Sequence, residues 1–521
     1  MTGITEPGPE GRTLDARLAF HARSRPDHVA IAHEDRTVDY ATLHRESTAT
    51  ARALRACGLT RGSRVAYLGK ESEHCYELLF ACARSGAVFV PVNWRLAPDE
   101  VEYILRDSSA ELLFVEEEFL PVARALRAEL PELRDVVPVG ELREWRETGA
   151  GTELPGGCDP DDPIAQMYTS GTTGYPKGVV LAHRTFFAVR DLLDSNGLDW
   201  IDFRDSDISL LGMSASHIGG IWWATQGFNA GITNVVVRSF GAEDVLQLIR
   251  DRGITTAILA PAMLLMLLAE PGVRPADFAA LRKVVYGGSP ISESLLQRCL
   301  DTMGCEFAQI YGLTETGNTA VCLPPADHVP GSPRLRAAGR PYPGIELKVV
   351  DRDGRDVGTG VVGEVCIRTP ARMLEYWRLP EATAATLVDG WVHTGDAGYL
   401  DDDGYVHVQD RIKEMIIRAG ENIYPAEVEN ALSAHPAVLD VAVVGVPDDR
   451  WGEAVHAFVV LHQGKSVAPH ELRAFARGRI ADFKIPTRYA FVDEVPRNPS
   501  GKILRRVLRE EFWSGRDRAV N

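Results

Sequence analysis

Residues 168–179 read YTSGTTGYPKGV, a stretch in which glycines alternate with hydroxyl side chains ahead of a single lysine. Glycine lets the backbone come close to an anion, so that its N–H groups can face the negative charge. The hydroxyls add hydrogen-bond donors, and Lys177 adds a mobile positive charge. The stretch therefore predicts a loop that cradles a polyphosphate. It is not a Walker A loop, because Lys177 lies between Pro176 and Gly178 and no GK[ST] ending follows.

Strand and helix patterns alternate on both sides of this loop. RVAYLG at 64–69 and AVFVPVN at 87–93 are typical of buried strands, and ESEHCYELLFACARSG at 71–86 between them is typical of a helix. The same order returns later, where DVLQLIRDRG at 244–253 precedes the strand-like TTAILA at 255–260. Such alternation predicts βαβ units, parallel sheets and functional sites at the ends of the strands.

The C-terminal part of the chain has a different pattern. Residues 335–410 form short strand-like runs separated by Asp-Gly turns, which favour hairpins. After DRIKE at 410–414 the chain is typical of a compact α+β unit, with a helix expected over ELRAFARGRIADF at 471–483. We therefore expect a large N-terminal domain over 1–410 and a small C-terminal domain over 411–521.

The composition disfavours several kinds of partner and site. The formal net charge is −17, and an acidic surface repels nucleic-acid phosphates and anionic lipids. The eight cysteines form no CxxC pair, which disfavours a disulfide framework or a zinc site and is typical of a reducing compartment. No signal-peptide pattern occurs at the N-terminus, and no apolar stretch reaches about 18 residues. We expect a cytoplasmic enzyme that neither binds nucleic acid nor inserts into a membrane.

Lysine is rare in this chain and marks particular positions. Only 8 of the 56 basic residues are lysine, so arginine serves almost everywhere that any cation would suffice. A compact and flexible ammonium group is therefore expected to matter where lysine appears inside a glycine-rich or charged motif. Lys177, Lys413 and Lys502 have such surroundings.

QIYGLTET at 309–316 places an aromatic residue, a tight glycine turn, a hydroxyl and a carboxylate in succession. The aromatic ring of Tyr311 can stack on a base, and Glu315 is a candidate magnesium ligand beside phosphates. A simpler interpretation of Glu315 is that it favours the start of a helix.

WVHTGD at 391–396 and NPSGK at 498–502 are two further candidate motifs. A carboxylate held on a turn, here Asp396, can accept both hydroxyls of a ribose, and Arg411 follows close behind in the sequence. A lysine on a glycine-flanked turn, here Lys502, can reach the cleft of another domain. Taken singly, Asp396 would only shape a hairpin and Lys502 would be a solvated surface charge.

Together, in this order and spacing, these stretches resemble the superfamily of adenylate-forming enzymes, which includes acyl-CoA synthetases, peptide-synthetase adenylation domains and firefly luciferase. The resemblance extends from about residue 38 to residue 506 and is greatest to bacterial fatty-acyl or aryl acid–CoA ligases. It implies an α/β fold: a large N-terminal domain of parallel-rich βαβ sheets with a small β-barrel-like part, and a small mobile α+β C-terminal domain. The motifs that carry it are SGTTGYPKG (170–178), YGGSP (286–290), YGLTE (311–315), GEVCIR (363–368), HTGD (393–396), DRIKEMIIRAGENIYP (410–425) and NPSGKILRR (498–506).

The resemblance also implies a role for each motif residue. Lys502 would bridge the attacking carboxylate and the α-phosphate, which Thr314 would contact, while Glu315 would bind magnesium. Lys413 would be the hinge between the domains, and Gly420 would line the tunnel for the acceptor. The implied ATP and AMP ligands are Thr169, Ser170, Gly171, Thr172, Thr173, Gly174 and Lys177 at the phosphates, Gly288, Ser289, Gln309, Tyr311 and Gly312 at the adenine, and Asp396 and Arg411 at the ribose.

The segment before the implied acyl pocket departs from the family pattern. Many relatives have a Pro-x-Phe-His stretch there, whereas this chain reads MSASHIGGIWW at 213–223. His217 is retained, and the resemblance makes it a catalytic-site and pocket residue together with Gly219, Trp222, Gly287 and Gly288. Adjacent helical residues point about 100° apart, so only one of the two tryptophans can face the pocket. An indole in the pocket predicts short, medium-chain or aryl acids rather than long-chain acids.

The predicted activity is that of an acid–CoA ligase. ATP and Mg²⁺ would convert a carboxylic acid to acyl-AMP with release of pyrophosphate, and CoA would take the acyl group. Positioning and charge neutralisation would do this work, because two anions must meet. The alternatives are the same adenylation chemistry with a carrier protein as acceptor or nitrous acid as substrate, as in diazotases, and a non-catalytic nucleotide-binding module.

Overall fold

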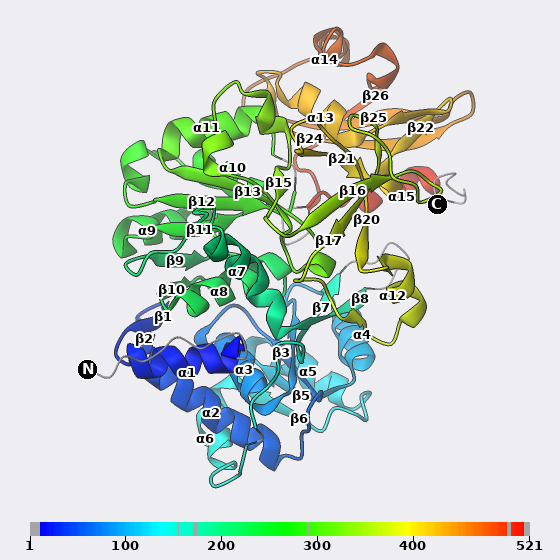
Figure 1. The fold of residues 1–521 in the computed structure, drawn as a ribbon. Helices are drawn as coiled ribbons and strands as arrows, with labels where there is room; N and C mark the ends of the chain where they lie inside the picture. The colour runs from blue at the N-terminus through cyan, green and yellow to red at the C-terminus, as the bar shows by residue number, and fades with distance from the viewer. Residues whose placement is uncertain (1–10, 155, 170–175, 290, 498–501, 515–521) are drawn as a thin grey trace.

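The computed structural model describes residues 11–154, 156–169, 176–289, 291–497 and 502–514. Two large sheets form the N-terminal three quarters of the molecule (Figure 1). In the first, the six central strands are parallel and the strands at both ends are antiparallel. Its order is β15 (Arg340–Pro341), β14 (Val321–Leu323), β13 (Glu306–Tyr311), β12 (Lys283–Gly287), β11 (Thr256–Leu259), β9 (Ile208–Leu211), β10 (Thr233–Val236), β1 (Val29–His33) and β2 (Arg36–Asp39).

The second sheet carries the predicted phosphate loop. Its parallel strands are followed by the antiparallel pair β7–β8, whose strands flank the predicted phosphate-loop stretch in the sequence. Its order is β18 (Glu375–Tyr376), β8 (Lys177–Ala182), β7 (Pro163–Thr169), β4 (Val88–Val92), β3 (Arg64–Leu68), β5 (Ala110–Val115) and β6 (Asp135–Pro138).

Helices cover the faces of both sheets and explain the apolar runs in the sequence. All five residues of β4 are buried, as expected for a parallel strand covered on both faces. Thr13 and Asp39 accept hydrogen bonds from backbone N–H groups at the starts of α1 and α2. The helices of this part are α1 (Leu14–Ser24), α2 (Tyr40–Ala56), α3 (Glu73–Ser85), α4 (Pro98–Ser108), α5 (Leu120–Arg127), α6 (Leu142–Glu147), α7 (Ala188–Ser195), α8 (Ile218–Ala230), α9 (Ala242–Arg252), α10 (Pro261–Ala269) and α11 (Glu293–Met303).

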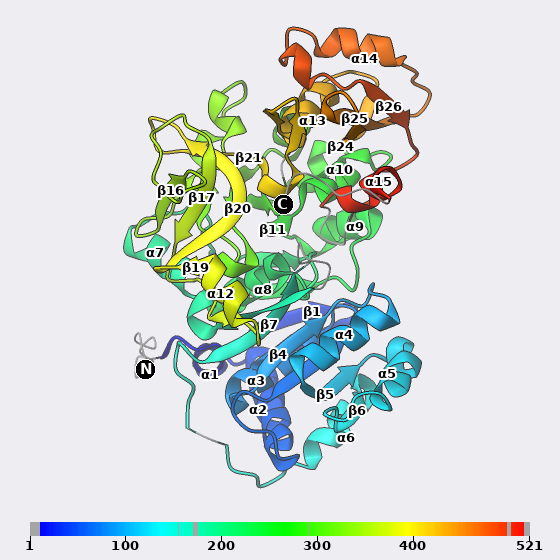
Figure 2. The same ribbon diagram turned by 90° about the vertical axis from the view of Figure 1, so that its right-hand side faces the viewer.

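A third, curved sheet contains the predicted hairpins and is the small barrel-like part (Figure 2). Its strands are all antiparallel, and helix α12 (Pro380–Thr386) lies beside them. They are β16 (Glu346–Val350), β17 (Gly363–Arg368), β20 (Trp391–Leu400), β19 (Leu387–Val388) and β21 (Val406–Arg411).

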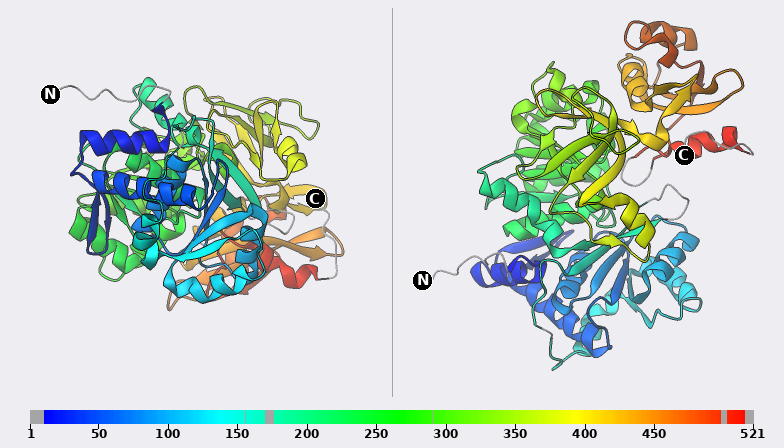
Figure 3. Two further views of the ribbon diagram at one scale, coloured as in Figure 1. Left: turned by 90° about the horizontal axis from the view of Figure 1, so that it is seen from below. Right: turned by 45° about the vertical axis from the view of Figure 1, so that its right-hand side comes forward.

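A fourth sheet and three helices form a unit at one end of the molecule (Figure 3, right). It has apolar clusters of its own, one around Val428 and Val455 and one around Val444 and Phe458. Its elements are β22 (Ile416–Arg418), β23 (Glu421–Ile423), α13 (Pro425–Ser433), β24 (Val438–Asp448), β25 (Gly452–Leu461), α14 (Pro469–Ala476), β26 (Arg488–Phe491) and α15 (Arg505–Trp513). The α/β fold class and the small α+β unit predicted from the sequence are confirmed.

Two local predictions were wrong. The helix expected over 471–483 ends at Ala476, because the chain turns at Gly478, which has a positive φ of 76°. Asp396 lies inside the long strand β20 rather than on a hairpin turn. The strand is nevertheless irregular next to Asp396, since Gly395 has a φ of 69° and the pairing with β17 shifts register nearby.

Candidate active site

Residues on strands of the first and third sheets bring two of the predicted motifs together. Tyr311 ends β13, and its phenol donates a 2.7 Å hydrogen bond to Oδ2 of Asp396 on β20. Arg411 pairs with Asp396 across β20 and β21, and its Nε lies 2.8 Å from Oδ1. Burial, followed by the charge of Asp396, raises the pKa of the Tyr311 phenol well above its usual value. The carboxylate predicted to hold a ribose is thus oriented from both sides.

Lys502 belongs to the same group of charges. Burial lowers the pKa of its ammonium, Arg411 lowers it further, and Asp396 acts in the opposite direction. Backbone pairing of Arg497 with Ile503 and a 2.8 Å hydrogen bond from Leu504 N–H to the carbonyl of Pro496 fix the chain next to it. Lys502, the lysine predicted to reach another domain's cleft, is therefore within electrostatic reach of Asp396 and Arg411.

The phosphate loop itself falls largely outside the described residues. Thr169 ends β7 and Lys177 begins β8, and the two are register partners across the hairpin. The predicted ligands between them, Ser170, Gly171, Thr172, Thr173 and Gly174, lie outside the part of the chain that the structure describes.

Tyr376, which sequence reasoning missed, connects the loop to the candidate magnesium ligand. Its ring lies 4.7 Å from Nζ of Lys177, and its phenol donates a 2.6 Å hydrogen bond to Oε1 of Glu315. Thr314 is buried next to Glu315 in a single 3₁₀ turn, Thr314–Thr316. The carboxylate of Glu315 is thus oriented by the same tyrosine that contacts the ammonium of Lys177, and the hydroxyl of Thr314 is adjacent in the chain. This set of groups suits a magnesium-bound polyphosphate.

The predicted adenine-pocket residues lie at the ends of β12 and β13. Gln309 accepts a 3.0 Å hydrogen bond from Tyr286 on the neighbouring strand. A side chain at Gly287 would meet the carbonyl oxygen of Ile310 at 2.5 Å, so only glycine fits there. Gly288 has a φ of 84° and an open space above it, with Ser289 following. Gly312 is equally restricted, because a Cβ would lie 2.6 Å from the carbonyl of Asn318.

His217 caps helix α8 at the predicted acyl pocket. Its Nδ1 accepts a 3.2 Å hydrogen bond from the N–H of Gly219. Burial, followed by the charge of Lys502, lowers the pKa of His217 to about 4, so the imidazole is neutral at pH 7. A neutral imidazole can line the binding site of a carboxylate without adding a positive charge that would repel the ammonium of Lys502.

A buried carboxylate holds the unusual segment ahead of His217. Glu71 accepts hydrogen bonds of 2.9 Å from the hydroxyl of Ser214 and from the N–H of Ala215, and one of 3.1 Å from Tyr76. Burial raises the pKa of Glu71. The serine that replaces proline in this segment is therefore used to fix the loop, a role that the sequence alone did not indicate.

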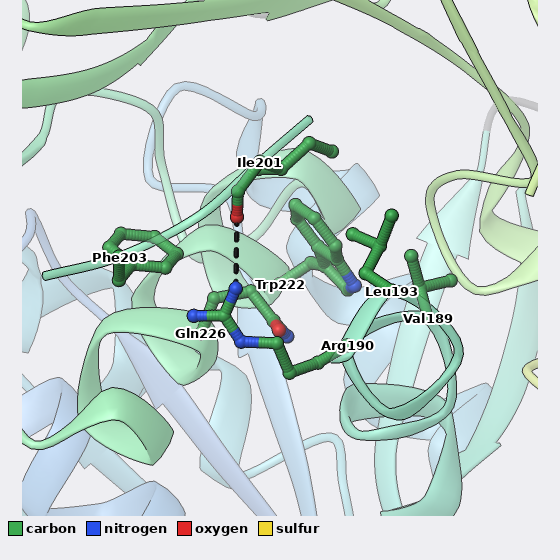
Figure 4. Close-up of a pocket in the computed structure, with 7 residues that line it drawn as sticks. All are labelled: Val189, Arg190, Leu193, Ile201, Phe203, Trp222 and Gln226. Atoms are coloured by element: carbon green, nitrogen blue, oxygen red, sulfur yellow. Dashed lines mark hydrogen bonds between the residues drawn. The ribbon is translucent and has the colours of Figure 1, made fainter. Parts of the chain in front are cut away.

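Both tryptophans of α8 are buried, Trp222 at 2% and Trp223 at 1% exposure. Trp223 packs on Phe203, with ring centroids 4.9 Å apart. Trp222 shares a helix face with Gly219 and lines a small cavity between α7 and α8 (Figure 4). Arg190 reaches into this cavity from α7 and donates a 3.0 Å hydrogen bond to the carbonyl of Ile201.

The predicted hinge residue, Lys413, and the predicted tunnel residue, Gly420, come after β21 in the sequence. Lys413 lies in a 3₁₀ turn, Ile412–Glu414, directly after β21. Gly420 has a φ of 87° at the turn between β22 and β23. Ala419 donates its N–H to the carbonyl of Trp451, so the backbone of the small unit shapes this turn.

The HTGD segment is held by a second carboxylate. Glu364 on β17 accepts 2.9 Å hydrogen bonds from the N–H of Gly395 and, through its other oxygen, from Nδ1 of His393. Cys366 lies 3.5 Å from the same histidine nitrogen. All eight cysteines are free thiols in this structure.

Taken together, these residues can bind a nucleotide and neutralise charge. Asp396, Arg411 and Tyr311 form one cluster, and the first two influence Lys502 electrostatically. Tyr376 contacts both Glu315 and Lys177. This arrangement suits a reaction in which a carboxylate approaches the α-phosphate of a nucleotide.

Known proteins match nearly the whole chain. The family model described as AMP-binding enzyme matches residues 18–377, and that of the AMP-binding enzyme C-terminal domain matches residues 427–502. The chain is 59% identical to the fatty acid–[acyl-carrier-protein] ligase ScoC of Streptomyces coeruleorubidus, over 98% of this chain and 99% of ScoC. It is 38% identical to an indoleacetate–CoA ligase of Aromatoleum aromaticum, over 94% of this chain and 96% of that protein.

A solved structure resembles the fold as a whole. The anthranilate CoA ligase AuaEII, in complex with anthranoyl-AMP, superposes with a TM-score of 0.90 at 28% identity and covers 98% of this chain and 99% of its own. No helix within the described ranges is long and apolar enough to cross a membrane.

Proposed function

Because the chain belongs to the AMP-binding enzyme family, we propose that it activates a fatty acid as acyl-AMP and passes the acyl group to the thiol of an acyl carrier protein. The observation that carries the choice of acceptor is the 59% identity with a fatty acid–[acyl-carrier-protein] ligase over 98% of the chain. The sequence led us to expect CoA instead. CoA remains the second candidate, since a CoA ligase is 38% identical over 94% of the chain.

The first step joins the acid to the nucleotide. A carboxylate oxygen attacks the α-phosphorus of ATP, the bond to the β-phosphate oxygen breaks, and pyrophosphate leaves. Lys502 neutralises the meeting anions, Thr314 contacts the α-phosphate, and Asp396 with Arg411 holds the ribose. Mg²⁺ supplies charge neutralisation on the phosphates. The fit of Glu315 to this ion rests on the hydrogen bond from Tyr376, which orients its carboxylate.

The second step transfers the acyl group. The carrier thiol loses its proton to solvent and attacks the carbonyl carbon of the mixed anhydride, a thioester forms, and AMP leaves with the electron pair of the broken C–O bond. We propose that the unit after residue 410 turns about Lys413 between the steps, which withdraws Lys502 and brings the Gly420 turn to the acceptor.

We further propose that the acid lies against His217 and along α8. Gly219 and Trp222 share one face of this helix, three residues apart, and His217 caps its start. In this proposal the indole of Trp222 limits the length of the acid that extends from His217 along that face. This arrangement favours short, medium-chain or aryl acids over long-chain acids.

An acceptor competition tests the proposed function. The enzyme is incubated with ATP, Mg²⁺ and hexanoate, and pyrophosphate release and thioesters are measured with holo carrier protein, apo carrier protein or CoA. The holo carrier is a phosphopantetheinylated acyl carrier protein from the same organism as the enzyme. We expect acylation of the holo carrier at a kcat/KM at least about tenfold above that for CoA.

The other outcomes are equally informative. A higher kcat/KM for CoA than for the holo carrier protein would show that CoA is the acceptor. Pyrophosphate release with nitrite but with none of hexanoate, benzoate and cinnamate would identify a diazotase-like activity. Nucleotide binding without pyrophosphate release for any acid would identify a non-catalytic module.

A further inference from the structure

A buried arginine lies three residues after Lys502. Arg505 is the first residue of α15 and is 8% exposed. Its guanidinium donates hydrogen bonds of 2.9 and 2.8 Å to the two carboxylate oxygens of Glu429 on α13 and lies 3.6 Å from Oδ1 of Asp410 on β21. None of the roles described above uses these three residues.

Both carboxylates are themselves fixed by backbone groups. Asp410 accepts hydrogen bonds from the N–H of Arg411 at 2.7 Å and from the N–H of Ala426 at 3.1 Å. Glu429 accepts one of 2.8 Å from the N–H of Val443 on β24. Arg505 therefore connects β21, the last strand before the Lys413 turn, to α13 and, through Glu429, to the central hairpin of the small unit. Figure 2 labels these elements, with α15.

The chain between Lys502 and Arg505 has little freedom. Ile503 pairs with Arg497, and the N–H of Leu504 bonds to Pro496 at 2.8 Å. Arg497 is tied in turn to Asp440 by two contacts of 2.9 Å. Because only two residues lie between Lys502 and Arg505 and their backbone is held by these bonds, fixing the position of Arg505 also fixes the position of the Lys502 backbone.

The charges in this cluster depend on one another. Burial raises the pKa values of Asp410 and Glu429, and Arg505 counteracts this in both. Burial would lower the pKa of Arg505, but Glu429 and Asp410 outweigh it and raise that pKa. Removing the guanidinium would leave two buried carboxylates without their cation, which disfavours this arrangement of the elements.

We propose that Arg505 is a positioning residue for adenylation: by pairing with Asp410 and Glu429 it holds Lys502 at the Asp396–Arg411 site. The inference rests on the proposed role of Lys502. Asp410 lies before the Lys413 turn and Arg505 after it, so this pair couples the strand that carries Arg411 to the segment that carries Lys502. Thioester formation, for which Lys502 is withdrawn, does not need this coupling.

The test separates the two half-reactions in Arg505→Met. ATP–pyrophosphate exchange with hexanoate reports adenylation, and thioester formation from supplied hexanoyl-adenylate reports transfer to the acceptor that the wild type uses. We expect exchange to fall by about 10- to 100-fold, mainly in kcat, and transfer to stay within about threefold. Arg505→Lys, which retains the charge, should recover part of the exchange rate. Arg506→Met is the matched control, because this neighbouring side chain is 82% exposed, and it should behave as wild type.

A double-mutant cycle with Asp410→Asn tests the coupling directly. If the pair acts as a unit, exchange by the double variant should be no slower than that of the slower single variant. Equal losses in exchange and transfer, with an earlier unfolding transition, would show a purely structural role and overturn the proposal. Normal exchange in Arg505→Met would overturn it too. Lys502→Ala is measured in parallel: normal exchange there would mean that the assignment of Lys502 itself fails, whatever Arg505→Met does.

Discussion

The phenol of Tyr376 donates a 2.6 Å hydrogen bond to Oε1 of Glu315, although 61 positions separate the two residues in the chain. Tyr376 belongs to the two-residue strand β18, which pairs with β8 and thereby places the ring near Lys177. The candidate magnesium ligand is thus oriented by a side chain from an edge strand of the sheet that carries the phosphate loop.

Tyr376→Phe should weaken the magnesium dependence of adenylation. Without the hydroxyl the Glu315 carboxylate is less well oriented, so the Mg²⁺ concentration for half-maximal exchange should rise by about tenfold. The rate at saturating Mg²⁺ should recover. Tyr405→Phe is the control, because that phenol bonds Asp327 at 2.7 Å instead and its loss should not move the magnesium curve. An unchanged curve in Tyr376→Phe would argue against Glu315 as the ligand.

Lys502→Ala should cut ATP–pyrophosphate exchange by roughly 10²–10³-fold or more, because one preorganised cation is lost beside the developing anion. Supplied acyl-adenylate should still be converted to thioester, since the lysine is withdrawn by then. A normal rate of ATP–pyrophosphate exchange in Lys502→Ala would show that Lys502 is not the lysine that acts in adenylation.

Lys413→Pro should have the opposite effect to Lys502→Ala: adenylation should be kept and transfer of the acyl group should be lost. Lys413 lies in a 3₁₀ turn, whose φ of about −50 to −70° is close to that of proline, so the present orientation of the small unit should be retained. We expect exchange to be largely kept and thioester formation to be largely lost. Equal loss of both steps would place the hinge elsewhere or show that proline unfolds the junction.

Trp222→Ala should shift the preference toward longer acids. Removing the indole opens the far end of the proposed pocket and should cost about 3–5 kcal/mol of stability, so rates are compared below the unfolding transition. The measured quantity is the ratio of kcat/KM for a sixteen-carbon acid to that for hexanoate. Trp223→Phe is the control: Trp223 packs on Phe203, and its indole N–H has no hydrogen-bond partner among the described residues.

The pocket prediction has a simpler check in the wild type. Faster turnover of a sixteen-carbon acid than of hexanoate, benzoate or cinnamate would show that the pocket is open and that Trp222 does not close it.

Acid should destabilise the large domain through buried histidines such as His183. Its Nδ1 accepts a 3.2 Å hydrogen bond from Leu14 N–H, and burial lowers its pKa from 6.5 to about 4. The unfolded chain therefore binds a proton first as the pH falls, so the stabilisation is complete above pH 6.5 and is lost toward pH 4.

Unfolding by urea at pH 7.5 and pH 5 measures this effect. His183→Asn should reduce the pH-dependent loss of stability by about 2 kcal/mol relative to the wild type. His470→Asn, at an exposed position, should leave the loss unchanged. An unaltered pH dependence in His183→Asn would mean that this histidine is protonated in the folded protein.

The sequence by itself determined the fold class and the order of the motifs. The alternation of apolar runs is a local property, and it placed β3, α3 and β4 within a few residues of their observed bounds. The motif around Lys177 predicted a phosphate loop because glycine and hydroxyl residues have the same local preferences in any fold. The family followed from these motifs, and the match to the AMP-binding enzyme models confirms it.

Only the tertiary structure decided which side chains support those motifs. Tyr376 at Glu315, Glu71 at Ser214 and Arg505 at Asp410 are contacts between residues far apart in the chain, and no spacing rule connects them. The position of Asp396 inside a strand was also decided at this level, since pairing with β17 and β21 extends the strand through Gly395. Burial, which lowers the pKa values of His217 and Lys502, depends on everything packed around them and cannot be obtained from neighbours in the sequence.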